Sequence, residues 1–192
     1  MEATYFFDPA CPFTWRTSRW LVGVAPQRDV TVRWRAFSLS ILNGDNVPDQ
    51  YKPMMAASSR ALRLVEALRA DHRDETIGTF YTELGNRTFE AGAPLSDDIV
   101  LAAAEAAGIA DAKAILDDAS WDDAVRSSHE TAFASAGPDI GSPVLAVEGA
   151  PRGLHGPIIG EVPARDEALA IWDAVVPLAR SATFFEVKRG RQ

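Results

Sequence analysis

The side chain best suited to covalent chemistry is Cys11, the only cysteine among 192 residues. It lies between an aromatic and β-branched run at residues 3–7 and Pro12, and proline is favoured in the first turn of a helix. A thiol at a helix start faces unpaired backbone N–H groups and the positive end of the helix dipole, which both favour the thiolate. We therefore predict a reactive, solvent-reachable nucleophile rather than a buried structural cysteine.

The residues that follow Cys11 are expected to shape its surroundings. Thr14 comes three residues later, so its hydroxyl and N–H are predicted to face the sulfur. Phe13 is predicted to be exposed beside the sulfur, and Arg16 and Arg19 are predicted to add positive potential from the next turns. A single cysteine also excludes any disulfide within the chain.

The histidines give no sign of a metal site. His72, His129 and His155 are the only three, and no pair has the spacing of metal ligands. We predict no bound metal. His129 lies on a predicted helix, where a surface or capping role is favoured over the rim of the active site. His155 precedes Gly156-Pro157. A surface or capping role is favoured for it as well, and a position near the active site is the alternative.

The elements that must position Cys11 follow from hydrophobic periodicity. Two strands and a helix come first, every periodic segment from about 49 to 136 is helical, and two strands and a helix end the chain. The expected segments are a strand at 3–7, a helix at 12–24, a strand at 30–37, strands at 144–147 and near 152–155, and a helix at 164–179. We predict an α/β fold with one sheet: residues 1–47 and 137–192 form its domain, and residues 48–136 are an inserted, all-helical lobe.

Within the helical lobe, Ser96 is predicted to cap a helix that Gly108 ends, and Ser120 to start another with a capping-box-like pattern. Met54 and Met55 begin the lobe. They are assigned to the core, with the lining of a substrate pocket as the alternative.

Composition excludes several classes of partner. The chain is 47% hydrophobic and 24% charged, as in ordinary globular proteins, and its net charge of −8 argues against nucleic-acid binding. No apolar stretch approaches the length of a membrane span. The N-terminus lacks the basic and apolar regions of a secretory signal, so we expect a cytoplasmic location. The oligomeric state stays open, a homodimer included.

The order of elements, with Cys11-Pro12 at the first helix and Ser142-Pro143 before a later strand, resembles the DsbA-like branch of the thioredoxin superfamily. The resemblance implies a thioredoxin-like fold, β-α-β … β-β-α, with the helical lobe inserted. It also implies that Pro143 is cis, and that Ser142 offers backbone hydrogen bonds to a bound thiol or substrate. Pro12 and Phe13 are the further expected contacts of that thiol.

A longer set of motifs is similar to the mycothiol-dependent nitroreductase and disulfide-oxidoreductase family. They are Phe7–Pro12, Ser18–Leu21, Phe37–Ser40, Ser128-His129, Gly141–Pro143, Gly156-Pro157, Ile171–Asp173, Phe184–Glu186 and Lys188-Arg189. The resemblance implies mycothiol, or a similar small thiol, as co-substrate with no tightly bound cofactor. The second substrate would be a disulfide or a small molecule, nitroaromatic compounds among them.

One departure from the family changes the expected mechanism. The family usually carries a second cysteine where this chain has Thr14. A mixed disulfide on Cys11 must then be released by an outside thiol, and Thr14 can only hydrogen-bond the thiolate. The alternatives are a kappa-type thiol transferase or isomerase, which activates its thiol cofactor without being oxidised, and a binding member without redox activity.

Overall fold

Strand β1 (Glu2–Phe7) lies inside a four-stranded sheet in the computed structural model, which describes residues 1–190. The strand order is β2-β1-β3-β4, with β2 at Thr31–Ala36, β3 at Val144–Val147 and β4 at Leu154–His155. β1 pairs in parallel with β2 and antiparallel with β3, and β3 pairs antiparallel with β4. The carboxyl ends of β1 and β2 and the start of β3 therefore meet at one edge of the sheet.

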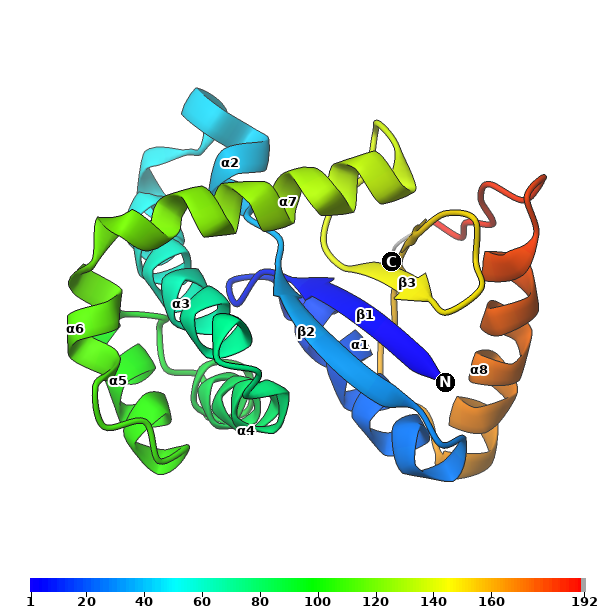
Figure 1. Cartoon of the computed structure of the whole chain (residues 1–192), viewed down its shortest axis with the longest axis horizontal. Helices are drawn as coiled ribbons and strands as arrows, with labels where there is room; N and C mark the ends of the chain where they lie inside the picture. The colour runs from blue at the N-terminus through cyan, green and yellow to red at the C-terminus, as the bar shows by residue number, and fades with distance from the viewer. Residues whose placement is uncertain (191–192) are drawn as a thin grey trace.

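Eight α-helices accompany the sheet in the described part of the chain. They are α1 (Pro12–Val24), α2 (Leu39–Asn43), α3 (Lys52–Ala70), α4 (Asp74–Gly85), α5 (Asp97–Ala106), α6 (Ala112–Asp117), α7 (Asp122–Ala136) and α8 (Arg165–Arg180). Figure 1 shows α1 behind the sheet with α8 beside it, α3 to α6 gathered on the other side of β2, and α7 crossing past the strands. None of these helices is long and apolar enough to cross a membrane.

Local sequence accounts for several helix starts. Pro12 occupies the first turn of α1, and the hydroxyls of Ser38 and Ser96 accept backbone N–H groups at the starts of α2 and α5. The capping box predicted at Ser120 is wrong, because that residue lies in a short 3₁₀ turn whose start is capped by the Asp118 side chain. Helices α2 and α6 were not predicted.

The core uses both faces of β1. Ala3, Tyr5 and Phe7 point into the large cluster shared with α1, α3, α4 and α8, while Phe6 packs on the opposite face with Phe37 from the segment after β2. Alternate residues of a strand point to opposite faces, so a strand buried on both sides reads as a continuous apolar run. This explains why residues 3–7 carry almost no polar side chain.

The last helix of the helical segment, α7, packs directly against the sheet. Val125 of α7 packs in one cluster with Ala36 of β2, and Ala132 of α7 packs with Phe6 and Val144. The division into residues 1–47 with 137–192 and an inserted 48–136 stays a prediction. Residues 191–192, the end of the second segment, lie outside the described residues.

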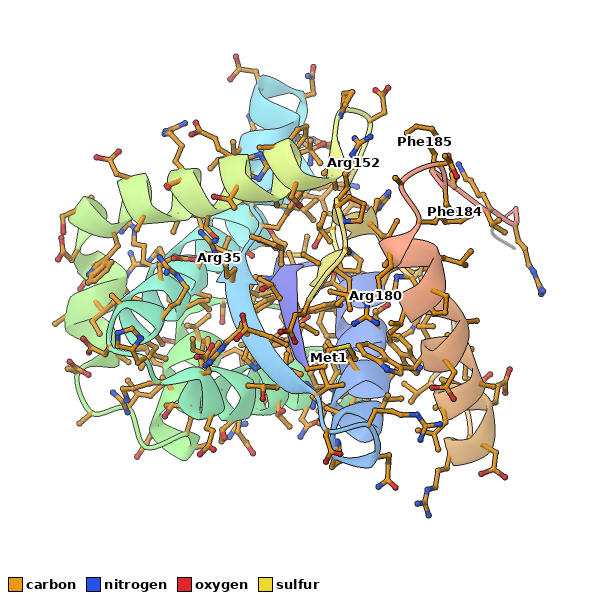
Figure 2. All side chains as sticks on the ribbon, turned by 45° about the vertical axis from the view of Figure 1, so that its right-hand side comes forward. Met1, Arg35, Arg152, Arg180, Phe184 and Phe185 are labelled. Carbon is orange, nitrogen blue, oxygen red and sulfur yellow. The ribbon has the colours of Figure 1, made fainter. Side chains whose placement is uncertain are left out.

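The segment after α8 lies beside the turn between β3 and β4. Figure 2 shows Phe184 and Phe185 next to Arg152, whose guanidinium carbon is 5.7 Å from the centre of the Phe185 ring. The same arginine donates to the carbonyl of Ala136 at the end of α7. Arg152 therefore joins the C-terminal segment, the β3–β4 turn and α7.

Candidate active site

Cys11 is the residue directly before α1, in an extended conformation with φ −92° and ψ 115°. Its N–H donates to the carbonyl of Asp8 at 3.1 Å, which closes a tight turn between β1 and the helix. No side-chain hydrogen bond caps the start of α1 at Cys11. The residue is 8% exposed, so it is less solvent-reachable than the sequence indicated.

The loop before β3 lies against Cys11. The thiol donates to the carbonyl oxygen of Ser142, with 3.7 Å between Sγ and O, and the Ser142–Pro143 peptide bond is cis. Sheet register explains the meeting, because Phe6 of β1 pairs with Val144 of β3. The loop that leaves β1 and the loop that enters β3 are therefore neighbours, although 131 residues separate Cys11 from Ser142.

Thr14 connects α1 to that loop. Its hydroxyl oxygen is 2.8 Å from the hydroxyl oxygen of Ser142, and its carbonyl accepts the Tyr5 hydroxyl at 2.7 Å. The side chain is fully buried. The hydrogen-bond partner of the Thr14 hydroxyl is Ser142 in the cis-proline loop. That this hydroxyl also faces the Cys11 sulfur stays a prediction.

Asp8 is a central residue of the site that sequence reasoning missed. Its carboxylate is buried and accepts the hydroxyl of Ser58 in α3 at 2.5 Å, the N–H of Ala10 at 2.8 Å and the N–H of Leu39 at 2.6 Å. Its own N–H donates to the Ser142 hydroxyl at 3.1 Å. Burial raises the pKa of Asp8, and the three donated hydrogen bonds oppose that rise. An aspartate directly after a buried strand was the available signal.

Two buried tyrosines, Tyr5 and Tyr81, lie in the neighbourhood of Cys11. Burial raises the pKa of Tyr5 and of Tyr81 well above the usual value, and the proximity of Cys11 adds to both shifts while Arg19 opposes them. Both phenols are therefore neutral. The Tyr81 hydroxyl is buried and has no hydrogen-bond partner. Tyr81 comes from α4, so the helical segment contributes directly to this region, and its apolar neighbours made it look like plain core in the sequence.

The comparisons with known proteins decide the family. Residues 10–189 match the model of the Rv2466c-like family, described as mycothiol-dependent nitroreductase Rv2466c. The chain belongs to the Rv2466c-like family. A protein of Mycobacterium tuberculosis (strain ATCC 25618 / H37Rv), Rv2286c, described as uncharacterized, is 29% identical over 191 residues, which cover 96% of this chain and 80% of that protein. The suspected kinship is confirmed.

Solved structures agree on the fold of this Rv2466c-like protein. A 2-hydroxychromene-2-carboxylate isomerase superposes with a TM-score of 0.61 at 15% identity, covering 94% of this chain and 97% of that chain. The cytosolic disulfide reductase DsbM from Pseudomonas aeruginosa has a TM-score of 0.56 at 14% identity and covers 93% of this chain and 100% of its own. A thioredoxin-like oxidoreductase from Silicibacter pomeroyi DSS-3 also scores 0.56, at 15% identity over 94% of this chain and 87% of that one.

The predicted fold class is therefore confirmed as an α/β, DsbA-like thioredoxin fold. Membership of the Rv2466c-like family makes the protein a thiol-dependent oxidoreductase. The family model covers Cys11, Thr14 and Ser142-Pro143 together.

The outer surface of the Rv2466c-like site is formed by the first turn of α1. Pro12 is exposed, and Phe13, for which the sequence predicted an exposed ring, is half-buried. The guanidinium of Arg16 lies 5.8 Å from the centre of the Phe13 ring, so this arginine covers the ring while staying in solvent. Met54 and Met55 are partly buried and pack against the main core, in agreement with the assignment to the core.

The surface or capping role expected for His129 is wrong. The ring is 5% exposed, lies 4.7 Å from the Phe37 ring centre, and accepts the N–H of Ser38 at Nδ1. Burial lowers the pKa of His129, so the ring is neutral with its proton on Nε2. It lines a shallow hollow between α2 and α7 of about 400 Å³ with Ile41, Leu42, Glu130 and Phe133.

His155 ends β4 opposite Val144, at the same sheet edge as Cys11, and it is exposed. Its ring faces Gly141 in the cis-proline loop, where a Cβ atom would lie 3.4 Å from Nε2. This position agrees with the alternative that placed His155 near the site. Among residues 1–190, no group of three or more His, Cys, Asp or Glu side chains is arranged to hold a metal ion.

Proposed function

We propose that this Rv2466c-like protein is a monothiol thiol–disulfide oxidoreductase in which Cys11 is the nucleophile and mycothiol, or a similar small thiol, is the co-substrate. The observation that carries the proposal is the contact of the Cys11 sulfur with the Ser142 carbonyl, 3.7 Å away, beside a fully buried Thr14. A threonine cannot attack a sulfur–sulfur bond. The cycle must therefore end with a thiol from outside the chain.

The proposed cycle has two exchange steps. The Cys11 thiolate attacks one sulfur of a substrate disulfide, which forms a mixed disulfide on Cys11 and releases the other half as a thiolate that takes a proton from water. The thiolate of mycothiol then attacks the substrate sulfur of that mixed disulfide. A mycothiol–substrate disulfide leaves and the Cys11 thiolate is restored, so the enzyme gains and loses no electrons over the cycle.

The residues around the sulfur have distinct proposed roles. The Ser142 backbone aligns the incoming sulfur, and Pro143 keeps the loop open toward it. Pro12 and Phe13, which border Cys11 at the helix start, are the proposed contacts of the small thiol. Thr14 holds the Ser142 hydroxyl at 2.8 Å, and in the proposed cycle it fixes the loop rather than the thiolate.

The family description supports a nitroaromatic compound as the second substrate class. Two thiols supply the two electrons needed to reduce a nitro group to a nitroso group, and the products are one disulfide and one water. In this route Cys11 forms the mixed disulfide with one mycothiol, and a second mycothiol releases it as mycothiol disulfide. Mycothiol remains reduced only in a reducing compartment, which accords with the expected cytoplasmic location.

Intact-protein mass spectrometry with mycothiol disulfide tests the proposal. The reduced wild type should gain the mass of one mycothiol less two hydrogens, keep this adduct until free mycothiol is added, and then lose it. Cys11→Ser should gain nothing. Thr14→Cys is the matched control, because its second thiol should expel mycothiol without added thiol and leave a Cys11 disulfide two mass units lighter than the reduced protein.

The same variants also test the two alternative functions, a thiol transferase or isomerase and a redox-inactive family member. A Cys11→Ser protein that keeps full turnover with a thiol co-substrate would replace the proposal with a transferase or isomerase that activates its thiol. A wild type that forms no adduct and turns over no disulfide would identify a redox-inactive member. Size-exclusion chromatography with light scattering measures the oligomeric state. A homodimer is one of the states that it would detect.

A further inference from the structure

Helices α2 and α7 (Figure 1) border a hollow of about 400 Å³ that the proposed function does not use. Its apolar walls are Ile41 and Leu42 from α2 and Phe133 from α7, which are all half-buried. His129 and Glu130 are the polar side chains that line it. The volume lies within the range of small-molecule sites, about 300–1,000 Å³, in which a few polar groups among apolar walls decide the ligand.

The His129 ring is held in one orientation at this hollow. Its Nδ1 accepts the backbone N–H of Ser38 at 3.3 Å, so its proton is on Nε2. The ring centre lies 4.7 Å from that of Phe37 and 5.1 Å from that of Phe133. Burial lowers the pKa of His129, so the ring is neutral at neutral pH. The donor on Nε2 is therefore in place before a ligand arrives, which lowers the entropic cost of binding.

The Nε2–H group of His129 has no hydrogen-bond partner in the described part of the chain. The ring makes its one hydrogen bond among residues 1–190 through Nδ1. Nε2 is not one of the side-chain atoms of that range that are both buried and unpartnered, so it reaches accessible space. The residue is only 5% exposed and lines the hollow, so that space is the hollow itself. A donor is thus left there for a ligand to satisfy.

Glu130 gives the hollow its charge. Its side chain is exposed, and its carboxylate opposes the lowering of the His129 pKa by burial, which places negative charge near the ring. Arg126, one turn earlier on α7, has a smaller and opposite effect on that pKa and does not line the hollow. A negatively charged ligand would be repelled by Glu130, whereas an uncharged ligand would not.

We propose that this hollow is a binding site for an uncharged aromatic molecule that carries a hydrogen-bond acceptor, such as an aryl ketone or amide. The acceptor takes the Nε2–H of His129, and the ring packs on Phe133 and Leu42. Phe37 and Phe133 are already stacked, with ring centres 6.1 Å apart and 19° between their planes, and the ligand ring extends this aromatic cluster. The inference uses no atom of Cys11, so it is independent of the proposed thiol chemistry.

Methyl NMR tests the proposal with acetophenone as the probe and ethylbenzene as the matched probe without an acceptor. Isotope-labelled methyl groups of Ile41 and Leu42 report binding at the hollow, and acetophenone should shift both saturably. His129→Asn keeps an acceptor for the Ser38 N–H but withdraws the donor. It should weaken acetophenone binding about fivefold and change ethylbenzene binding by less than about twofold. The ratio of the two dissociation constants cancels any general change in the shape of the hollow.

Two further variants separate the wall and the charge from the donor. Ile41→Ala removes apolar contact only, so it should weaken both probes to the same extent, by about threefold, with Leu42 as the reporter. Glu130→Gln should strengthen the binding of benzoate by about twofold and leave that of acetophenone unchanged.

Unchanged Ile41 and Leu42 signals up to the solubility limit of acetophenone would overturn the proposal, as would a ratio that His129→Asn leaves unaltered. Signals that move with protein concentration alone would show that a second copy of the chain fills the hollow, which would overturn it as well. If His129→Asn does not fold, Ile41→Ala decides, and acetophenone binding that this variant leaves unchanged would refute the proposal.

Discussion

The hydroxyl oxygens of Thr14 and Ser142 lie 2.8 Å apart, although 128 residues separate them in the chain. One hydroxyl donates to the other, and the Ser142 oxygen also accepts the N–H of Asp8 at 3.1 Å. The hydrogen bond between the two hydroxyls ties α1 to the loop before β3.

Removal of the Thr14 hydroxyl should destabilise the protein. Thr14→Val keeps the shape but leaves the buried Ser142 hydroxyl with one partner fewer, at a cost of about 1–2 kcal/mol in the free energy of unfolding. A double-mutant cycle with Ser142→Ala, followed by urea denaturation, should give a coupling energy of about 1 kcal/mol. Thr79→Val, at an exposed helix position, is the control and should change stability by less than about 0.5 kcal/mol. Strict additivity of Thr14 and Ser142 would contradict the prediction.

Asp8 should make stability fall as the pH rises from mildly acidic values. Its folded-state pKa is raised above the ordinary 3.8 by burial, so the native state holds the proton more tightly than the unfolded chain. The resulting stability is fully present below pH 3.8 and is lost as the pH rises through the raised pKa. Asp8→Asn lacks this titration. Its amide NH₂ cannot accept the hydrogen bond from the Leu39 N–H, so the variant is less stable at every pH.

Urea denaturation of both proteins from pH 3.5 upward checks this prediction. The free energy of unfolding of the wild type minus that of Asp8→Asn should decrease with pH across that window, by at most about 1.4 kcal/mol per pH unit. A difference that stays constant or increases with pH would contradict it.

His129 should have the opposite pH dependence. Its folded-state pKa is lowered below 6.5 by burial, so its contribution to stability is present above pH 6.5 and is lost as the pH falls through the lowered pKa. His129→Asn keeps an acceptor for the Ser38 N–H but does not titrate. Thermal denaturation between pH 5 and pH 8 should show a smaller acid-side loss for His129→Asn than for the wild type. His72→Asn, at an exposed position with φ 57°, is the control variant.

Two helical glycines should respond to alanine with opposite signs. A Cβ at Gly85 in α4 would lie 2.1 Å from ring atoms of Trp15, which is itself enclosed by Tyr81 and Phe89. Gly85→Ala should cost about 2 kcal/mol or more. Gly23 in α1 has nothing within 4 Å of the same position, so Gly23→Ala should stabilise the protein by about 0.5–1 kcal/mol. Denaturant midpoints of the two variants measure the contrast, and equal effects would refute it.

Local signals predicted much of the fold. The helix after Cys11 begins at Pro12 and ends at Val24 as expected, because proline and apolar periodicity act over a few residues. The strands at Thr31–Ala36 and Val144–Val147 follow from alternation and β-branched residues. Helices Leu39–Asn43 and Ala112–Asp117 were missed because one or two turns are too short to show a period.

The candidate site was predictable only in part. Cys11 was found from its helix start, whereas its contact with Ser142 came from family resemblance, since no local pattern joins residues 131 apart. Asp8 looked like a turn residue and Tyr81 like core, because each acts through contacts made by the tertiary fold. His129 was placed on the surface because one helix pattern does not reveal a second helix and a loop packed against it.

The carboxylate of Asp8 has one more consequence, for hydrogen–deuterium exchange. The amides of Ala10 and Leu39 donate to Asp8 rather than to a sheet ladder or to an earlier helical turn. Each can exchange with solvent only when the junction of β1, α2 and α3 loosens. The exchange rates of these two amides therefore report local opening of the structure around Cys11. The difference between their protection and that of the amides in the neighbouring strand measures how often this region opens while the rest of the protein stays folded.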